Sequence, residues 1–138
     1  MWVTNFRDGT LSKIDIATAQ VEGEPLKTGA GARGVTEGFG AVWVSNLHDD
    51  TVTRVDPDTF EVEAQIKVGK EPKELVTAFG SVWVVNSRSN TVTRIDPRTN
   101  RVSGGPIAVG RNPIGITATK GAIWVTNFGD DTVSAIAP

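Results

Sequence analysis

The sequence predicts an all-β fold built from a repeated unit of about 40 residues. Tryptophan occurs only at positions 2, 43, 83 and 124, so the successive spacings are 41, 40 and 41 residues. The segments around these tryptophans alternate apolar and polar residues and are rich in β-branched side chains, as half-buried antiparallel strands are. No segment repeats its apolar residues at the 3.6-residue period of a helix.

The repeat extends well beyond the tryptophans. An asparagine follows each tryptophan by three residues, at Asn5, Asn46, Asn86 and Asn127. A threonine follows each asparagine by five, at Thr10, Thr51, Thr91 and Thr132. Longer blocks recur as VWVSNLHDDTVTRVDPDT, VWVVNSRSNTVTRIDPRT and IWVTNFGDDTVSAIAP. Self-similarity at a fixed period indicates one structural unit used several times.

Each unit divides into four short predicted strands, here named a to d. In the second and third units, strand a is 34–36 or 74–77, strand b holds the tryptophan, and strand c is 51–55 or 91–95. Strand d is predicted over 62–68 and over the equivalent residues of the other units. Gly40, Gly80 and Gly121 mark the turn from a to b. Asp-Pro-x-Thr at 56–59 and 96–99 ends strand c, since Asp accepts backbone N–H groups and Pro presets a turn.

Four antiparallel strands in a unit of this length predict the blade of a β-propeller. A sheet this small cannot bury both faces alone, so we expect the blades to stack with the tryptophans between them. Each indole would bury about 150–250 Å². A sugar-stacking role for the tryptophans is less favoured, because packing explains one tryptophan in every unit more simply. The repeated asparagines are predicted to close the loop between strands b and c through side-chain to backbone hydrogen bonds.

The strands read bcd, abcd, abcd, abc, which makes fourteen strands and about three and a half blades. We therefore expect one domain over 1–138, with repeats at about 2–42, 43–82, 83–123 and 124–138. The start falls inside strand b and looks cut, whereas the end resembles a propeller terminus. An isolated arc leaves apolar faces and strand edges open. We expect a homo-oligomer, most simply a homodimer that closes the ring with strand sharing at the junctions.

The pattern VWVxN…TVxxIDPxT…VxxxIxVGxxPxGI resembles the YVTN-type propeller repeat, which is related to the NHL repeat. The resemblance covers essentially the whole chain and implies a propeller of a family that is often extracytoplasmic, with members in secreted proteins and bacterial sensor domains. A related branch, the streptogramin lyases, has the same blade architecture and relies on a His-centred metal site. This sequence has only His48, so it does not reproduce that site.

Composition excludes several functional classes. Lys plus Arg number 14 against 16 Asp plus Glu, so no basic face for nucleic acid is expected. No polybasic anchor and no apolar stretch of about 18 residues is present, so membrane insertion is not expected. The first residues carry no signal-peptide pattern, and the location of the protein stays open. Without cysteine there is neither a disulfide nor thiol chemistry.

The sequence offers no catalytic constellation. His48 is the only candidate base, and it lies in a variable loop where a surface position is expected. Zinc sites take several His or Cys ligands, so no metal site is predicted. The acidic segments 46–50 and 127–131 lack the spacing of a calcium loop, and their Asp and Asn residues are predicted to be turn formers. The Gly-rich segment 29–34 precedes a strand instead of a helix, so it is no nucleotide fingerprint, and no cofactor is expected.

Binding residues are predicted at the loops. In a propeller, the d–a and b–c loops lie on one face around the central channel, and loops on a rigid scaffold carry function. The candidate ligand-binding residues at this rim are Arg7, Arg33, His48, Lys70, Lys73, Arg88 and Arg111. Glu71 and Glu74 are the negative charges expected among these cations. This positive rim predicts a small anion or an acidic peptide as partner, and the alternative is solvated charge that keeps the protein soluble.

These observations predict a non-enzymatic β-propeller scaffold or ligand- and protein-binding module, in the form of an oligomerising half-propeller. Two alternatives stay open. One is a metal-dependent enzyme of the streptogramin-lyase type, and the other is a structural propeller fragment without a ligand.

Overall fold

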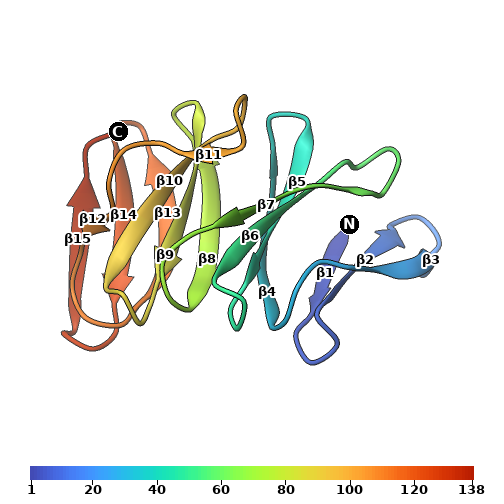
Figure 1. Ribbon diagram of the computed structural model, residues 1–138, viewed down its shortest axis with the longest axis horizontal. Helices are drawn as coiled ribbons and strands as arrows, with labels where there is room; N and C mark the ends of the chain where they lie inside the picture. Colours follow the sequence, from blue (N-terminus) through green and yellow to red (C-terminus); the bar gives the residue numbers. More distant parts are fainter.

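The computed structural model describes residues 1–138 and consists of fifteen strands with no helix, which confirms the all-β prediction. The strands form four antiparallel sheets that follow one another along the chain (Figure 1). The first sheet holds β1 (Trp2–Asn5), β2 (Thr10–Asp15) and β3 (Gln20–Lys27). The second holds β4 (Ala32–Gly38), β5 (Ala41–Asn46), β6 (Thr51–Val55) and β7 (Val62–Lys67). The third holds β8 (Pro72–Ala78), β9 (Ser81–Asn86), β10 (Thr91–Asp96), β11 (Arg101–Val102) and β12 (Ile107–Ala108). The fourth holds β13 (Pro113–Thr119), β14 (Ala122–Asn127) and β15 (Thr132–Ile136).

Each sheet is a meander in which strands that follow one another in sequence pair with one another, except that β12 pairs with β10 and not with β11. Strands a of the second, third and fourth sheets are β4, β8 and β13, and these three strands lie side by side. The sheets therefore converge at their a strands and diverge toward their d strands, as the blades of a propeller do. This arrangement is a partial β-propeller.

The third sheet differs from the prediction, because its outer strand is split. Strand d was expected to be continuous, but β11 and β12 pair separately with β10. The chain bulges at Ser103-Gly104-Gly105-Pro106, where Gly104 has φ +77° and Pro106 has no N–H to donate. The Ser103 N–H still donates to the Arg94 carbonyl at 2.8 Å. The split accounts for fifteen strands where fourteen were predicted.

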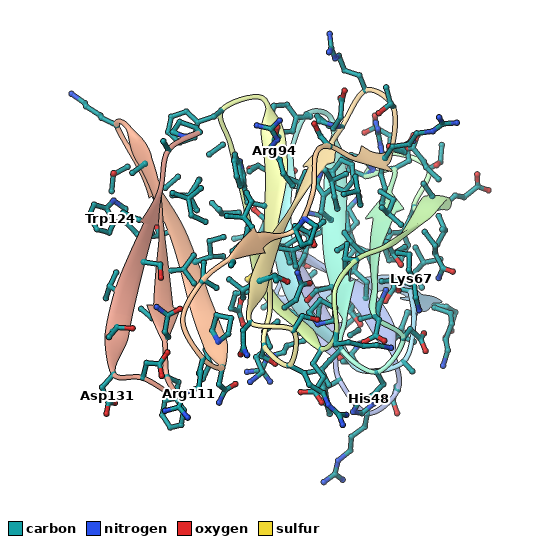
Figure 2. All side chains as sticks on the ribbon, turned by 60° about the vertical axis from the view of Figure 1, so that its left-hand side comes forward. His48, Lys67, Arg94, Arg111, Trp124 and Asp131 are labelled. Atoms are coloured by element: carbon teal, nitrogen blue, oxygen red, sulfur yellow. The ribbon has the colours of Figure 1, made fainter.

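The hydrophobic core lies between successive sheets. Trp43 is fully buried between the second and third sheets, among Val52, Ile66, Val82 and Ile95. Trp83 is buried in the same way between the third and fourth sheets. The packing role predicted for the tryptophans is thus confirmed for these two. Trp124 has no following sheet to pack against, and its side chain is 41% exposed (Figure 2).

A cation on the neighbouring strand covers the first three indole rings. Arg54 lies 5.3 Å from the ring centre of Trp43, Arg94 lies 5.5 Å from that of Trp83, and Lys13 lies 5.8 Å from that of Trp2. Each cation is the cross-strand partner of its tryptophan. At Trp124 the partner is Ala135, so the last sheet leaves this position apolar.

Candidate functional site

The b–c loops and the d–a connections meet at one end of the sheets, as the sequence predicts. Figure 2 shows His48, Arg111 and Asp131 together at its lower end, opposite Arg94. Backbone hydrogen bonds join the two kinds of loop, since the His48 N–H donates to the Ala30 carbonyl at 3.1 Å. The third and fourth sheets repeat this bond, from Arg88 to Lys70 at 3.2 Å and from Gly129 to Arg111 at 2.9 Å.

Polar side chains hold these loops further in place. The side chains of Asp49 and Ser89 accept the N–H groups of Ala30 and Lys70, each at 2.7 Å. A second set of bonds reaches the next sheet. Asp50 accepts the Glu71 N–H at 2.9 Å, and Asn90 accepts the Asn112 N–H, also at 2.9 Å. The loop face is therefore a hydrogen-bonded layer that crosses the boundaries between sheets.

The repeated asparagines support this layer mainly through bonds to side-chain hydroxyls, and only Asn86 also makes the expected bond to the backbone, to the Thr91 carbonyl at 3.4 Å. Asn46 donates to the hydroxyls of Thr51 and Thr53 at 3.0 and 2.8 Å. The other three asparagines make the same pair of contacts, to residues five and seven positions later. Hydroxyl acceptors on strand c are available because Asn46 and Thr51 are cross-strand partners. The signal that sequence reasoning missed is the Ser or Thr seven residues after each asparagine.

Two of the predicted rim cations are held by local carboxylates. Lys70 pairs with Asp50 at 2.7 Å, and Arg111 pairs with Asp130 at 2.6 Å. Burial by itself would raise the pKa of Asp50, but the hydrogen bonds from Lys70 and Glu71 and the charges of Lys70 and Lys67 lower it. The side-chain hydrogen bond from Arg111, together with its backbone N–H, lowers the pKa of Asp130.

The rim is therefore less positive than the sequence suggested. Only Glu71 and Glu74 were expected to oppose the cations, yet Asp50 and Asp130 are the closest partners. The sequence predicts these acids only as turn formers. Their ion pairs join loops that lie 20 and 19 residues apart in sequence, and the aligned acidic positions of LHDD and FGDD are the sequence signal that was available.

Three predicted residues come together in one surface hollow of about 510 Å³, namely His48, Lys70 and Arg88. Arg88 is 76% exposed and lies 3.7 Å from Glu71, which also lines the hollow. His48 packs edge-on against Phe6 with ring centres 5.3 Å apart. His48 thus makes a loop contact, and Arg7 forms no ion pair.

Arg33 and Lys73 take a different position, at β-bulges in the a strands. The register shifts between Ala32 and Val35, and again between Pro72 and Leu75. Bulges re-aim the side chains beside them. Arg33 lies 3.9 Å from Glu74 of the next sheet, and the Lys73 amine lies 3.4 Å from the Asn112 side-chain oxygen. Both cations thus reach toward the following sheet, where their partners lie at the long distances of 3.9 and 3.4 Å. The equivalent residue of the fourth sheet is Ile114.

No three His, Cys, Asp or Glu side chains converge in a way that would hold a metal ion. The structure also has no helix long and apolar enough to span a membrane.

Comparison with known proteins agrees with this geometry. The family model of the YNCE-like beta-propeller matches residues 30–109, which is more than half of the chain. The chain belongs to the YNCE-like beta-propeller family. This family was not the one named from the sequence, so the YVTN and NHL names stay a prediction. No curated protein sequence matches the chain.

Solved structures show the same fold as this YNCE-like propeller. A streptogramin B lyase structure matches with a TM-score of 0.83 at 20% identity, over 99% of this chain and 47% of that one. A catalytically inactive virginiamycin B lyase from Staphylococcus aureus, solved with quinupristin, matches with a TM-score of 0.81 at 17% identity, over 99% and 48%. The computationally designed Ika4 protein matches with a TM-score of 0.73 at 16% identity, over 95% and 81%. The chain spans about half the length of the two lyases, and identities this low show the fold alone.

Proposed function

We propose that this YNCE-like propeller is a non-enzymatic binding module that takes a small anion or an acidic peptide at the a-strand end of its loop face. The observation that carries the proposal is the pair of bulges that set Arg33 and Lys73 on neighbouring a strands. The two strands are close at this point, because a Cβ added to Gly34 would lie 2.5 Å from the Lys73 carbonyl oxygen.

The electrostatic state of these two cations supports the proposal. Lys70 and Arg111 are already engaged by carboxylates at 2.7 and 2.6 Å, so an added anion gains little from them. Arg33 and Lys73 have partners only at 3.9 and 3.4 Å. Exposed pairs at such distances contribute little. Two cations on neighbouring a strands, each with a weak partner, attract a carboxylate or phosphate by charge, and Arg adds a planar pair of N–H donors.

The test is a titration of the protein with citrate and with an oligo-glutamate peptide, followed by calorimetry at low salt. We expect binding that weakens as salt rises, because screening reduces attraction between exposed charges. The double variant Arg33→Gln/Lys73→Gln should lose at least about tenfold in affinity, since each removed charge contact contributes on the order of 1 kcal/mol. The matched control Arg98→Gln/Arg101→Gln removes two cations near the c–d turn and should bind as the unaltered protein does. Equal loss in both double variants would contradict the proposal.

We also propose that the two outer sheets dock onto a second copy of this chain. Trp124 and Val133 on the fourth sheet are 41% and 59% exposed, although the equivalent Trp43 and Val52 are fully buried. On the first sheet, Val3 is 36% exposed, whereas its equivalent Val44 is fully buried. The chain builds this interface three times internally, so its two open faces are complementary halves of the same contact.

Sedimentation velocity tests this docking. The unaltered protein should be dimeric at micromolar concentration, and Trp124→Lys should shift it toward the monomer, because a charge would then enter an apolar interface. Phe79→Lys is the matched control, since Phe79 is 45% exposed in a turn of the third sheet. A folded monomer of the unaltered protein at these concentrations would overturn the docking proposal without touching the anion site.

A further inference from the structure

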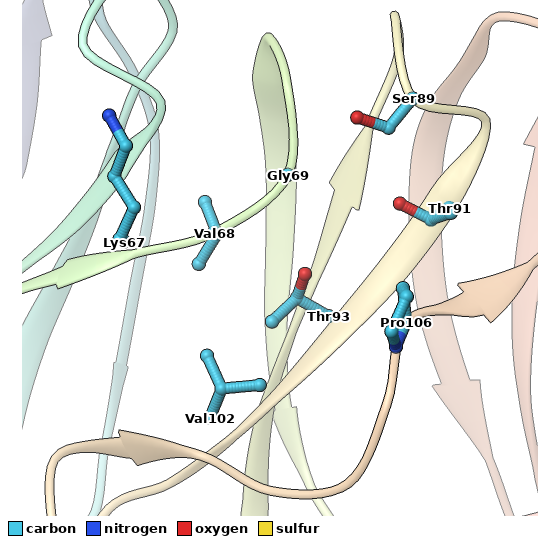
Figure 3. A pocket seen from close by; sticks show the side chains of 8 residues that line it. All are labelled: Lys67, Val68, Gly69, Ser89, Thr91, Thr93, Val102 and Pro106. Carbon is cyan, nitrogen blue, oxygen red and sulfur yellow. The ribbon is translucent and has the colours of Figure 1, made fainter.

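A second hollow, which none of the loop-rim cations lines, lies in the outer cleft between the second and third sheets (Figure 3). Its volume is about 360 Å³, room for several molecules of water, each of which takes about 30 Å³ in the liquid. The lining residues are Lys67, Val68, Gly69, Ser89, Thr91, Thr93, Val102 and Pro106. Most of the exposed lining is carbon, from Val68, Val102 and Pro106, with the hydroxyl of Thr93 between them (Figure 3).

In the preceding cleft, between the first and second sheets, side chains of the protein itself occupy the equivalent position. There the carbonyl oxygen of Thr28 accepts two hydrogen bonds, each of 2.8 Å. One comes from the hydroxyl of Thr53 and the other from the side-chain amide of Gln65. Gln65 lies in β7, which pairs with β6 at this position. The chain thus places a carboxamide of its own in this cleft.

The third sheet has the same framework without that carboxamide. Val68 takes the place of Thr28. The N–H of each residue donates, at 3.0 Å, to the carbonyl of the fourth residue in the b–c loop of its own sheet, which is Asp50 for Val68 and Gly9 for Thr28. Thr93 takes the place of Thr53, and each accepts a bond from the asparagine seven residues earlier. Pro106 stands where Gln65 stands, directly before the apolar residues Ile107 and Ile66. The bulge at 103–106 therefore replaces an amide with a ring that cannot donate.

One acceptor and one donor are left unused in this cleft. The Val68 carbonyl accepts no hydrogen bond, and the Thr93 hydroxyl accepts from Asn86 at 2.9 Å but donates to nothing. Thr93 is only 6% exposed, so its hydroxyl lies in a largely desolvated place. Buried polar groups are normally satisfied, and a partner here would have to offer both a donor and an acceptor.

We propose that this outer cleft binds a primary carboxamide. Its N–H donates to the Val68 carbonyl, its C=O accepts from the Thr93 hydroxyl, and its carbon chain lies against Val102 and Pro106. The bond from the ligand N–H to the Val68 carbonyl is the one that Gln65 makes to Thr28 in the preceding cleft, whereas the ligand C=O takes the proton that Thr53 there donates directly to Thr28. The carboxamide comes either from a small free amide or from a Gln side chain of a peptide, and the test separates these two sources.

The test is an NMR titration of ¹⁵N-labelled protein with propionamide, and with methyl propionate as a probe that keeps the propionyl group but lacks the N–H. Propionamide should shift the amide signals of Gly69, Thr91 and Thr93, whereas the ester should not. A peptide with a central Gln and a free carboxylate end is compared with its Glu counterpart. Shifts with propionamide alone assign a small amide as the source, and shifts with the Gln peptide as well assign a peptide.

Variants at both clefts sharpen the test. Thr93→Val keeps the shape and removes the donor, so propionamide affinity should fall about fivefold. The matched control Thr53→Val makes the same change beside Gln65 and should leave the affinity unaltered. Pro106→Gln should abolish binding by supplying the amide internally, and Gln65→Ala should open a second site near Thr28. Tryptophan fluorescence reports whether each variant is folded.

Two results would overturn the proposal. One is the absence of shifts in the outer cleft at high millimolar propionamide, and the other is equal affinity of Thr93→Val and Thr53→Val. The Arg33→Gln/Lys73→Gln variant should bind propionamide normally, so this inference and the anion site fail or stand independently.

Discussion

The guanidinium of Arg54 lies over the indole of Trp43, 5.3 Å from the ring centre, and from there it reaches the next sheet. It donates to the Pro97 carbonyl at 2.6 Å and to the Asn100 side-chain oxygen at 2.9 Å. The same group pairs with Glu63 at 2.5 Å. One side chain therefore covers the packed ring, neutralises a carboxylate and joins the second sheet to the third.

Replacing Arg54 with Met should weaken the contact between these sheets. The variant keeps apolar cover over Trp43 but loses two bonds between sheets, and bonds to charged groups contribute about 1.5–3 kcal/mol each. We expect the free energy of unfolding, measured with urea, to fall by about 2–4 kcal/mol. Arg94→Met is the matched control, because Arg94 covers Trp83 but bonds only to Ser103 of its own sheet, at 3.2 Å. An equal loss in the two variants would show that the bonds between sheets contribute nothing.

A glycine in the d–a connection makes room for the repeated asparagine. A Cβ added to Gly69 would lie 2.6 Å from Cγ of Asn86, which is fully buried. Gly69→Ala should therefore destabilise the protein by about 1–3 kcal/mol through overpacking. Gly105→Ala serves as the control, since a Cβ there meets nothing within 4 Å. Thermal unfolding should separate the two, and a Gly69→Ala variant as stable as Gly105→Ala would mean that the asparagine is free to move.

The pairing of Asp130 with Arg111 should make the last loop sensitive to acid. The hydrogen bond from Arg111 lowers the pKa of Asp130 below the ordinary value for an aspartate. A carboxyl whose pKa is lowered by folding stabilises the native state above its unfolded pKa, and this contribution is lost as pH falls through the folded pKa. Asp130→Asn lacks the titrating group. The stability difference between the unaltered protein and this variant should be constant from about pH 7 to 5 and should shrink below about pH 4. A difference that grows in acid would have the wrong sign for this pair.

The sequence alone located the strands well, because the repeat supplies each strand several times. Strand c, predicted over 51–55, is β6 at those same residues. The split of the third outer strand was missed, although Gly104-Gly105-Pro106 is a run of turn residues inside the predicted strand. A bulge changes the path of the chain without interrupting the sequence repeat, so the repeat gave no sign that this strand is split.

The loop chemistry was less accessible to sequence reasoning. The prediction that the loops lie on one face is correct. Asp50 is predicted only as a turn former, but its carboxylate accepts hydrogen bonds from the Lys70 amine and from the Glu71 N–H at the start of the next sheet. Such contacts depend on how two sheets pack. The outer cleft was not predicted from the sequence for the same reason. It arises because Pro106 replaces the amide of Gln65, and this difference has an effect only where Val68 and Thr93 pack beside it.

The central claim is that each sheet is stabilised by the tryptophan buried between it and the next, and a pair of variants tests it most directly. Urea unfolding should show that Trp43→Ala loses about 3–5 kcal/mol, as large core truncations do. The same measurement on Trp124→Ala should show a loss of less than about 2 kcal/mol, because that ring is 41% exposed and faces no sheet of its own chain. The concentration is kept low enough for the protein to be monomeric. Losses of equal size at the two positions would contradict the account.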